Sequence, residues 1–217
     1  MKKFIALVPM KAQSERVKNK NIRDLAGKPL FYYILSTLKK CKDISAIYVN
    51  TDSDKIIEFI NQDFKGINII RRPQHLVGHD IPMNDIIQYD LSQIKGDYFL
   101  QTHSTNPLLS AETIEKAIEA FWAHPKCDSL FSVTKMLKRY YDSKRRPINH
   151  DRKKLLNTQD LEAIYEENSC IYLFSKKSFE VNGNRLGSNP YMFETNKSEA
   201  IDIDDEYDFE MVKKIIK

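Results

Sequence analysis

The chain has 217 residues, and its 34 Lys and Arg against 30 Asp and Glu give a formal net charge of +4. This length suits one α/β domain, residues 1–217, with a substantial core. The mild positive charge favours an anionic small ligand as readily as nucleic acid. Three widely spaced cysteines without a paired-ligand pattern disfavour a disulfide framework and a zinc ribbon. The cysteine pattern fits a reducing cytoplasm, where we expect the protein to lie. Because no apolar segment reaches the roughly 20 residues of a membrane helix, we expect no membrane contact.

The first feature along the chain is an apolar run over residues 4–8 that ends at Pro9 and opens into a cationic loop. The loop has no amphipathic period and carries Lys11, Arg16, Lys18, Lys20 and Arg23. It closes at Gly27 and Pro29, where glycine permits a tight turn and proline can occupy the first position of a helix starting near Leu30. A buried strand, a donor-rich loop and a helix start form a phosphate-binding arrangement, because amide N–H groups and Lys/Arg converge on one anion.

Strand and helix signals then alternate along the chain. Apolar runs predict strands at residues 44–50, 67–70, 97–102 and 129–135. Helical spacing and capping residues predict four helices. The first starts near residue 30, the second follows an N-cap within residues 51–54, the third covers residues 84–94, and the fourth runs from a cap at Ser110 to Trp122. Such alternation argues for a mostly parallel sheet flanked by helices, with its ligand crevice at the carboxyl ends of the strands.

Acidic residues gather near the C-terminus, where residues 199–205 are predicted to form a short strand before an amphipathic helix. Strand alternation would place Asp202 and Asp204 on one face. Magnesium is commonly held by one or two carboxylates together with substrate phosphates, so this spacing suits it. Alternatively, Asp204 is a helix N-cap, with Asp205 and Glu206 favouring the helix dipole. The residues alone leave both interpretations open.

A basic excursion at about residues 137–168 surrounds Tyr140 and Tyr141 and has little apolar period. Basic residues interleaved with aromatic ones can hold phosphates and stack bases, which would make this a nucleic-acid surface. A charge run is more often a solvated loop. Neither alternative is excluded by composition.

Taken in order, these segments resemble the CMP-sugar synthetase family, the cytidylyltransferases that activate acylneuraminate acids and, more distantly, Kdo. The family has a loop of the type R-x-x-S-K-G-x-x-x-K-N, followed by L-x-G-K-P-L. This chain matches the first motif at Ser14, Lys20 and Asn21, with Lys11 in place of the Arg. It matches the second motif at Leu25, Gly27, Lys28, Pro29 and Leu30. The terminal I-D-I-D-x-x-x-D-(F/L) is matched through Asp208 and Phe209. The resemblance implies a Rossmann-like nucleotidyltransferase fold, usually dimeric, that makes a CMP-sugar for a surface polysaccharide.

The same resemblance implies roles for individual residues in binding CTP. The phosphates are expected on the first loop, at Lys11, Gln13, Ser14, Arg16, Lys20 and Asn21. The family's (R/K)-R-P-x-x-L segment assigns Arg72 to the nucleotide, and Asn84 supplies a polar group where Met83 replaces the usual Ser or Thr. Asp202 and Asp204 would hold Mg²⁺, and they would act with Lys20 as the catalytic residues.

The acceptor is expected to contact His103, Thr105, Asn106, Gln159 and Tyr165, which match or replace residues of the family motifs L-L-Q-P-T-S-P-L-R and R-Q-x-L-P-x-x-Y. His103 stands where the family has Gln. Leu109 and Thr158 each stand where it has Arg, and the second of these arginines would pair with the carboxylate of a sugar acid. These departures fall on acceptor-facing positions.

The function implied is transfer of CMP from CTP to the hydroxyl of an acidic sugar, with release of pyrophosphate. The basic excursion would then be an arm that packs on the partner subunit of a homodimer, and nucleic acid would not be a partner. The alternatives are a cytidylyltransferase for another sugar acid or for a phosphorylated or phosphonate alcohol, and a nucleotide- or nucleic-acid-binding protein without turnover.

Overall fold

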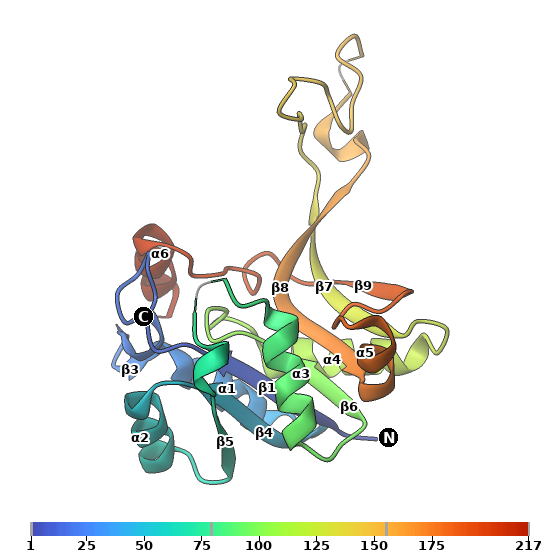
Figure 1. Cartoon of the computed structure of the whole chain (residues 1–217). Coiled ribbons are helices and arrows are strands. Elements are labelled where there is room, and N and C mark those ends of the chain that lie inside the picture. Colours follow the sequence, from blue (N-terminus) through green and yellow to red (C-terminus); the bar gives the residue numbers. More distant parts are fainter. Residues whose placement is uncertain (1, 79, 155, 217) are drawn as a thin grey trace.

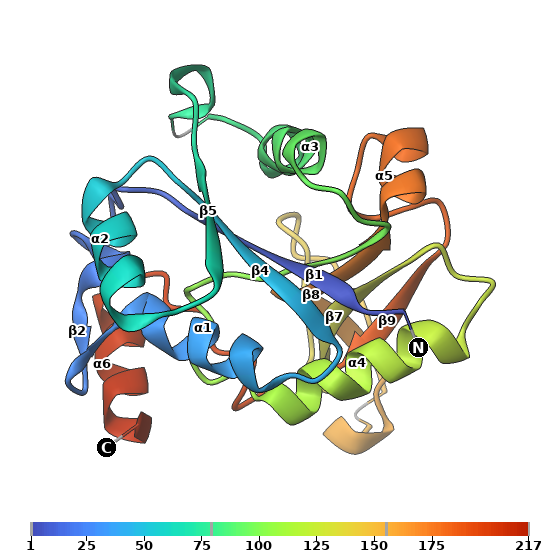
Figure 2. The same cartoon turned by 90° about the horizontal axis from the view of Figure 1, so that it is seen from below.

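A seven-stranded sheet forms the centre of the molecule and has helices on both faces (Figures 1 and 2). The computed structural model describes residues 2–78, 80–154 and 156–216. The strand order is β5-β4-β1-β6-β8-β7-β9. None of the helices in these residues is long and apolar enough to span a membrane.

The sheet is mostly parallel, which confirms the predicted fold class. Its parallel half consists of β1 (Phe4–Met10), β4 (Ile44–Thr51), β5 (Ile67–Arg71) and β6 (Tyr98–Gln101). Strand β8 (Ile164–Ser175) runs antiparallel to both β6 and β7 (Ser129–Met136), and β9 (Pro190–Glu194) is parallel to β7. A small hairpin, β2 (Asp24–Leu25) with β3 (Lys28–Pro29), closes the first loop.

The α-helices are α1 (Leu30–Lys40), α2 (Asp54–Asp63), α3 (Met83–Gln93), α4 (Ala111–Ala123), α5 (Lys176–Asn182) and α6 (Glu206–Ile216). Short 3₁₀ turns lie at η1 (Lys20–Ile22), η2 (Gln74–Leu76) and η3 (Thr158–Asp160). Ser110 caps α4 as predicted, and Ser53, one of the four residues expected to hold an N-cap, caps α2, since each hydroxyl accepts a backbone N–H three residues later. Pro29 is the N-cap of α1 rather than its first helical residue, because it is still paired with Asp24 in the hairpin.

Burial on both faces explains why β1 is a continuous apolar run. Phe4, Ala6 and Val8 face a core that includes residues of α1, α2 and α4, while Ile5 and Leu7 pack against residues of α3 and α5. Figure 2 shows α3 and α5 on one side of the sheet and α1 and α4 on the other. The carboxyl end of β1 is therefore held by two cores.

The C-terminal segment corrects two expectations. Residues 201–205 form no strand; the Ile203 N–H donates to the Thr105 carbonyl at 2.9 Å, and the Ile203 side chain is fully buried. Asp205, not Asp204, caps α6, because its Oδ1 accepts the N–H of Asp208 at 3.0 Å. The Asp208 carboxylate in turn accepts the N–H groups of residues 204 and 205. This reciprocal capping leaves the Asp204 side chain available for other contacts.

Residues 137–154 and 156–163, which lie between β7 and β8, project away from the body of the molecule and are called the arm (Figure 1). Asn149 holds the arm together from inside. Its Oδ1 accepts from the Tyr140 N–H at 3.0 Å, and its Nδ2 donates to the carbonyls of Lys138 and Glu162 at 2.8 and 2.9 Å. The arm nevertheless exposes Tyr141 and Ile148.

Candidate active site

A cavity of about 260 Å³ lies at the carboxyl ends of β1 and β6. Seven of the predicted site residues line it: Lys11, Ser14, Lys20, Asn21, Arg72, His103 and Thr105. An adjoining cavity of about 200 Å³ shares Lys11 and Arg72 and adds Gln13 and Asp52. The first loop, the segment after β5 and the loop after β6 therefore meet at one place, as expected for the crevice of a parallel sheet.

Buried hydrogen bonds fix the first loop on the sheet. Asn21 Nδ2 donates to the Lys11 carbonyl at 2.9 Å, and Asn21 Oδ1 accepts from the Ser104 hydroxyl at 2.6 Å. The Ala12 N–H donates to Asp52 Oδ1 at 2.8 Å. Because both side-chain ends of Asn21 are used inside the protein, this residue positions the loop and its cations.

The first loop meets the C-terminal acids directly. Lys20 Nζ donates to the Ile203 carbonyl at 2.6 Å and lies 3.9 Å from Asp204 Oδ1. Arg16 Nη2 lies 2.8 Å from the same carboxylate oxygen. Burial lowers the pKa of Lys20, while the nearby Asp202 and Asp204 act to raise it. Asp202 and Asp204 themselves line a second cavity, of about 420 Å³. Basic groups from one end of the chain and carboxylates from the other thus meet at Lys20, which lines the first cavity and contacts Asp204.

Asp202 is more enclosed than Asp204. Its Oδ1 is buried and has no hydrogen-bond partner within the described part of the chain. Burial raises the pKa of Asp202, and Asp204 adds to this, whereas a hydrogen bond from Thr105 lowers it. Among the described residues no group of three or more His, Cys, Asp or Glu is placed to hold a metal ion. A divalent cation here would therefore take at most this pair of carboxylates, with the remaining ligands coming from substrate oxygens or water.

Arg72 enters the cavity from a buried polar network that the sequence did not reveal. Its Nε donates to Asn50 Oδ1 at 2.7 Å, and Asn50 Nδ2 donates to Asp90 Oδ1 at 2.5 Å. Burial lowers the pKa of Arg72 and raises that of Asp90 to about 7. The only sequence signals were a polar residue ending the apolar strand at Asn50 and an acid on the apolar side of α3 at Asp90.

Besides Arg16, Asp202 and Asp204, four predicted residues lie outside the linings of these two cavities. The side-chain Oδ1 of Asn84 accepts the backbone N–H of Arg185 at 3.3 Å, and its neighbour Met83 lines the cavity instead. Asn106 is fully buried, with neither amide atom hydrogen-bonded within the described residues. Gln159 lies in η3 on the arm, and Tyr165 is exposed near the start of β8.

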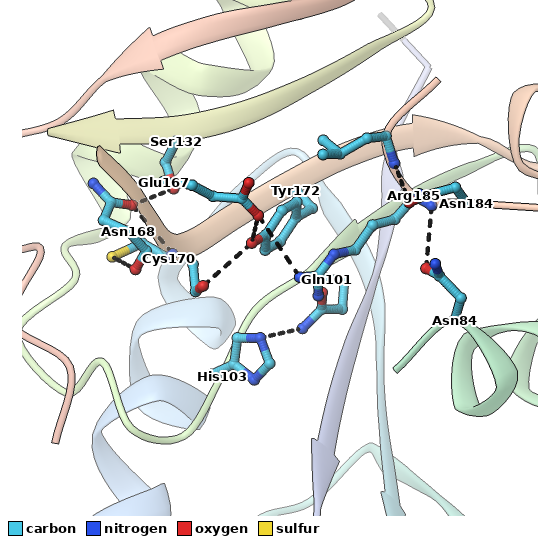
Figure 3. Close-up of polar contacts among 12 residues, drawn as sticks. Asn84, Gln101, His103, Ser132, Glu167, Asn168, Cys170, Tyr172, Asn184 and Arg185 are labelled. Atoms are coloured by element: carbon cyan, nitrogen blue, oxygen red, sulfur yellow. Dashed lines mark hydrogen bonds and ion pairs between the residues drawn. The ribbon is translucent and has the colours of Figure 1, made fainter. Parts of the chain in front are cut away.

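A second polar network, also missed from the sequence, connects His103 to β8 (Figure 3). Arg185 Nη1 donates to Gln101 Oε1, and Gln101 Nε2 lies 3.0 Å from His103 Nε2. The Arg185 guanidinium carbon lies 3.5 Å from the centre of the Tyr172 ring, and its Nη2 lies 3.9 Å from Glu167 Oε1. Burial, followed by the charges of Arg185 and Lys20, lowers the pKa of His103 to about 3.

A mostly parallel sheet with cations and carboxylates meeting beside it is the arrangement expected of a nucleotidyltransferase. The family model for cytidylyltransferases matches residues 5–216, and the protein belongs to that family. The predicted family and enzyme class are therefore confirmed.

Among the relatives, the post-translational flagellin modification protein B of Campylobacter coli is 25% identical over 227 residues, covering 100% of this chain and 96% of that protein. The N-acylneuraminate cytidylyltransferase of Escherichia coli O18:K1:H7 is 26% identical over 223 residues. That alignment covers 96% of this chain and 51% of the relative, so the chain spans about half of the relative's length.

The solved structure of a CMP-2-keto-3-deoxy-manno-octonic acid synthetase complexed with CTP matches with a TM-score of 0.73 and 16% identity. The match covers 99% of this chain and 98% of that one, and it establishes the shared fold.

Proposed function

We propose that this cytidylyltransferase transfers CMP from CTP to the hydroxyl of an acidic sugar and releases pyrophosphate. Relatives named for N-acylneuraminate, and a structural neighbour complexed with CTP, support the acidic sugar and the nucleotide. The observation that carries the proposal is the position of Lys20. Its ammonium group lines the cavity and lies 3.9 Å from Asp204, so it can face substrate phosphates on one side and the carboxylates on the other.

The first loop is suited to a triphosphate because its cations and backbone amides can share the phosphate charge. Lys11, Ser14 and Lys20 line the cavity and Gln13 lines the adjoining one. Arg72 lies between the two cavities and is suited to contact the rest of the nucleotide. Asn21 would act by holding the loop, and Arg16 by pairing with Asp204.

Asp202 and Asp204 are the residues that would hold Mg²⁺. The buried, unpartnered Oδ1 of Asp202 fits this role, because a bound cation would supply the partner that the described residues do not provide. When bound, Mg²⁺ would neutralise phosphate charge and polarise the reacting oxygen.

In the reaction the acceptor oxygen attacks the α-phosphorus in line and gives up its proton to water, while the bond from that phosphorus to the departing pyrophosphate breaks. Lys20 and the first loop stabilise the charge that develops on the phosphates. Positioning and electrostatics supply most of the acceleration in such chemistry, so no covalent nucleophile is required.

We further propose that the enzyme is a homodimer in which the arm of one subunit packs on the other. Gln159 and Tyr165, which lie on or beside the arm, would then contribute to an acceptor site from the partner's side. The exposed Tyr141 and Ile148 support this assignment, because apolar side chains on a projecting segment are suited to an interface.

The test measures pyrophosphate release with Mg²⁺, each of the four nucleoside triphosphates, and a panel of acceptors. The panel contains N-acetylneuraminate, Kdo, a neutral hexose and a phosphorylated alcohol. The proposal expects release with CTP and an acidic sugar alone. Release with the phosphorylated alcohol would favour the alternative acceptor class, and salt-dependent RNA binding without turnover would overturn the enzyme function.

A further inference from the structure

The hydrogen bonds that end at His103 have a definite direction. Arginine nitrogens carry only donors, so the bond from Arg185 Nη1 requires Oε1, not Nε2, of Gln101 to face Arg185. Gln101 Nε2 then has two acceptors, the Thr102 carbonyl at 3.1 Å and His103 Nε2 at 3.0 Å. The orientation of the Gln101 amide is therefore fixed from both ends.

This direction determines where the proton of His103 lies. Because Gln101 Nε2 is a donor, His103 Nε2 must accept, and the proton of the neutral ring is left on Nδ1. Figure 3 shows the other ring nitrogen of His103 turned away from Gln101. His103 lines the cavity, and no residue of the described chain forms a hydrogen bond with its Nδ1.

Arg185 is well placed to set this direction because it is itself fixed. Its guanidinium stacks on Tyr172, and its charge is balanced by Glu167, whose Oε1 also accepts the Tyr172 hydroxyl. Its backbone N–H donates to Asn84. Gln101 is fully buried in the sheet. The chain from Glu167 to His103 thus consists of groups with little freedom to rearrange.

We propose that Arg185 and Gln101 are positioning residues that hold His103 as the neutral Nδ1–H tautomer, so that His103 donates a hydrogen bond to an oxygen of the acceptor molecule. This inference rests on the proposed function for the identity of its ligand. The only ring nitrogen of His103 with a free electron pair is Nε2, and it already accepts a hydrogen bond from Gln101. His103 therefore acts as a donor and not as a general base. Arg185 and Lys20, the charged groups that face the ring, both disfavour its protonation.

The tautomer can be observed directly by long-range ¹H–¹⁵N NMR of the histidine rings, without any substrate. The signals of His103 are assigned as those lost in the His103→Asn variant. We expect a protonated Nδ1 and an unprotonated Nε2 at every pH from 5 to 8. A proton on Nε2, or titration of the ring within this range, would overturn the proposal.

The Gln101→Glu variant reverses the direction of the last hydrogen bond. An ionised glutamate at this position can only accept, so His103 must then place a proton on Nε2. We expect the NMR pattern to change accordingly and the KM for the acceptor to rise roughly fivefold to tenfold, with the KM for CTP unchanged. Gln93→Glu, at an exposed position of α3, is the matched control. An unchanged tautomer in a folded Gln101→Glu protein would contradict the inference.

Two substitutions of Arg185 separate positioning from simple structural support. Arg185→Lys keeps a donor for Gln101 and should keep the tautomer, whereas Arg185→Met removes it and should produce a mixture of tautomers. Equal spectra for the two variants would count against the proposal. Since these spectra need no turnover, they distinguish failure of this inference from failure of the proposed function, which pyrophosphate release tests.

Discussion

Arg16 and Asp204 form an ion pair, with 2.8 Å between Nη2 and Oδ1, although 188 positions separate them in the chain. Together with the bond from Lys20 to the Ile203 carbonyl, this pair joins the first loop to the segment before α6. The two charge groups singled out in the sequence are therefore neighbours in the fold.

The Arg16→Gln substitution tests whether this pair serves the ligand or the fold. Both side chains are more than 40% exposed, and such pairs contribute only about 0–1 kcal/mol to the free energy of unfolding. We expect urea denaturation to show a change within that range. The KM for CTP should rise several-fold, because Asp204 loses the cation that pairs with it beside the first loop. Lys18→Gln removes the same charge from an exposed position of the same loop, and an equal rise in KM there would contradict a specific role for Arg16.

The Asp202→Asn substitution should abolish turnover while the fold is retained. Asparagine keeps the shape of the side chain, and the burial that raises the pKa of Asp202 shows that its charge is not favourable for folding. We expect kcat to fall by about a hundredfold or more, since a cation site supplies several kcal/mol to such a reaction.

Pyrophosphate release and thermal unfolding together check this prediction. Asp205→Asn is the matched control, because it removes the same charge three positions further along and asparagine also caps helices well. Near-normal turnover in Asp202→Asn, or equal losses in both variants, would disprove the assignment.

Local signals were sufficient to predict much of the fold. Ser110 was recognisable as a cap because its side chain acts within three residues, and the apolar run of β1 indicated a buried strand. The prediction for residues 199–205 failed for a related reason. Ile203 is buried between two acidic residues, so the segment has the alternating polar and apolar pattern of a strand. However, no strand within the described residues pairs with this segment.

The candidate site was only partly predictable, because its networks join distant parts of the chain. Asn50 and Asp90 lie 40 positions apart, and Gln101 and Arg185 lie 84 apart. Arg185 follows a short helix and belongs to no motif, so nothing local distinguishes it from a solvated arginine. Only the antiparallel pairing of β8 with β6 brings Tyr172 beside Gln101 and thereby creates its site.

Asp90 should make the stability of the protein depend on pH. Its pKa is raised by burial to about 7, against about 3.9 for an unfolded Asp. The folded state therefore binds more protons than the unfolded state between these values, and the free energy of unfolding falls as pH rises from about 4 to 7. Asp90→Asn keeps an acceptor for Asn50 and removes this titration.

We expect the Asp90→Asn variant to gain stability relative to the wild type as the pH is raised from 5 to 8, as measured by urea denaturation. Asp97→Asn removes an equal charge from an exposed position and should show no such trend. A difference between wild type and Asp90→Asn that stays constant over this range would contradict the proposed titration.

The arm should carry the dimer interface. Tyr141 and Ile148 are 51% and 57% exposed in the single chain, and burying the exposed half of each at an interface would contribute about half of the ~1.5–3 kcal/mol that full burial gives. Replacing both with serine should therefore shift the protein from dimer to monomer in light scattering at micromolar concentration.

The fold of the subunit should survive this change, because Asn149 holds the arm from within and the substitution removes from the described part of the arm only the contact of Tyr141 with His150. Val181→Ser, at a 76% exposed position of α5, is the matched control and should leave the mass unchanged. If the double variant remains a dimer, the arm is not the interface. Acceptor binding by Gln159 and Tyr165 from a partner subunit would then have to be abandoned, because both assignments depend on the same contact.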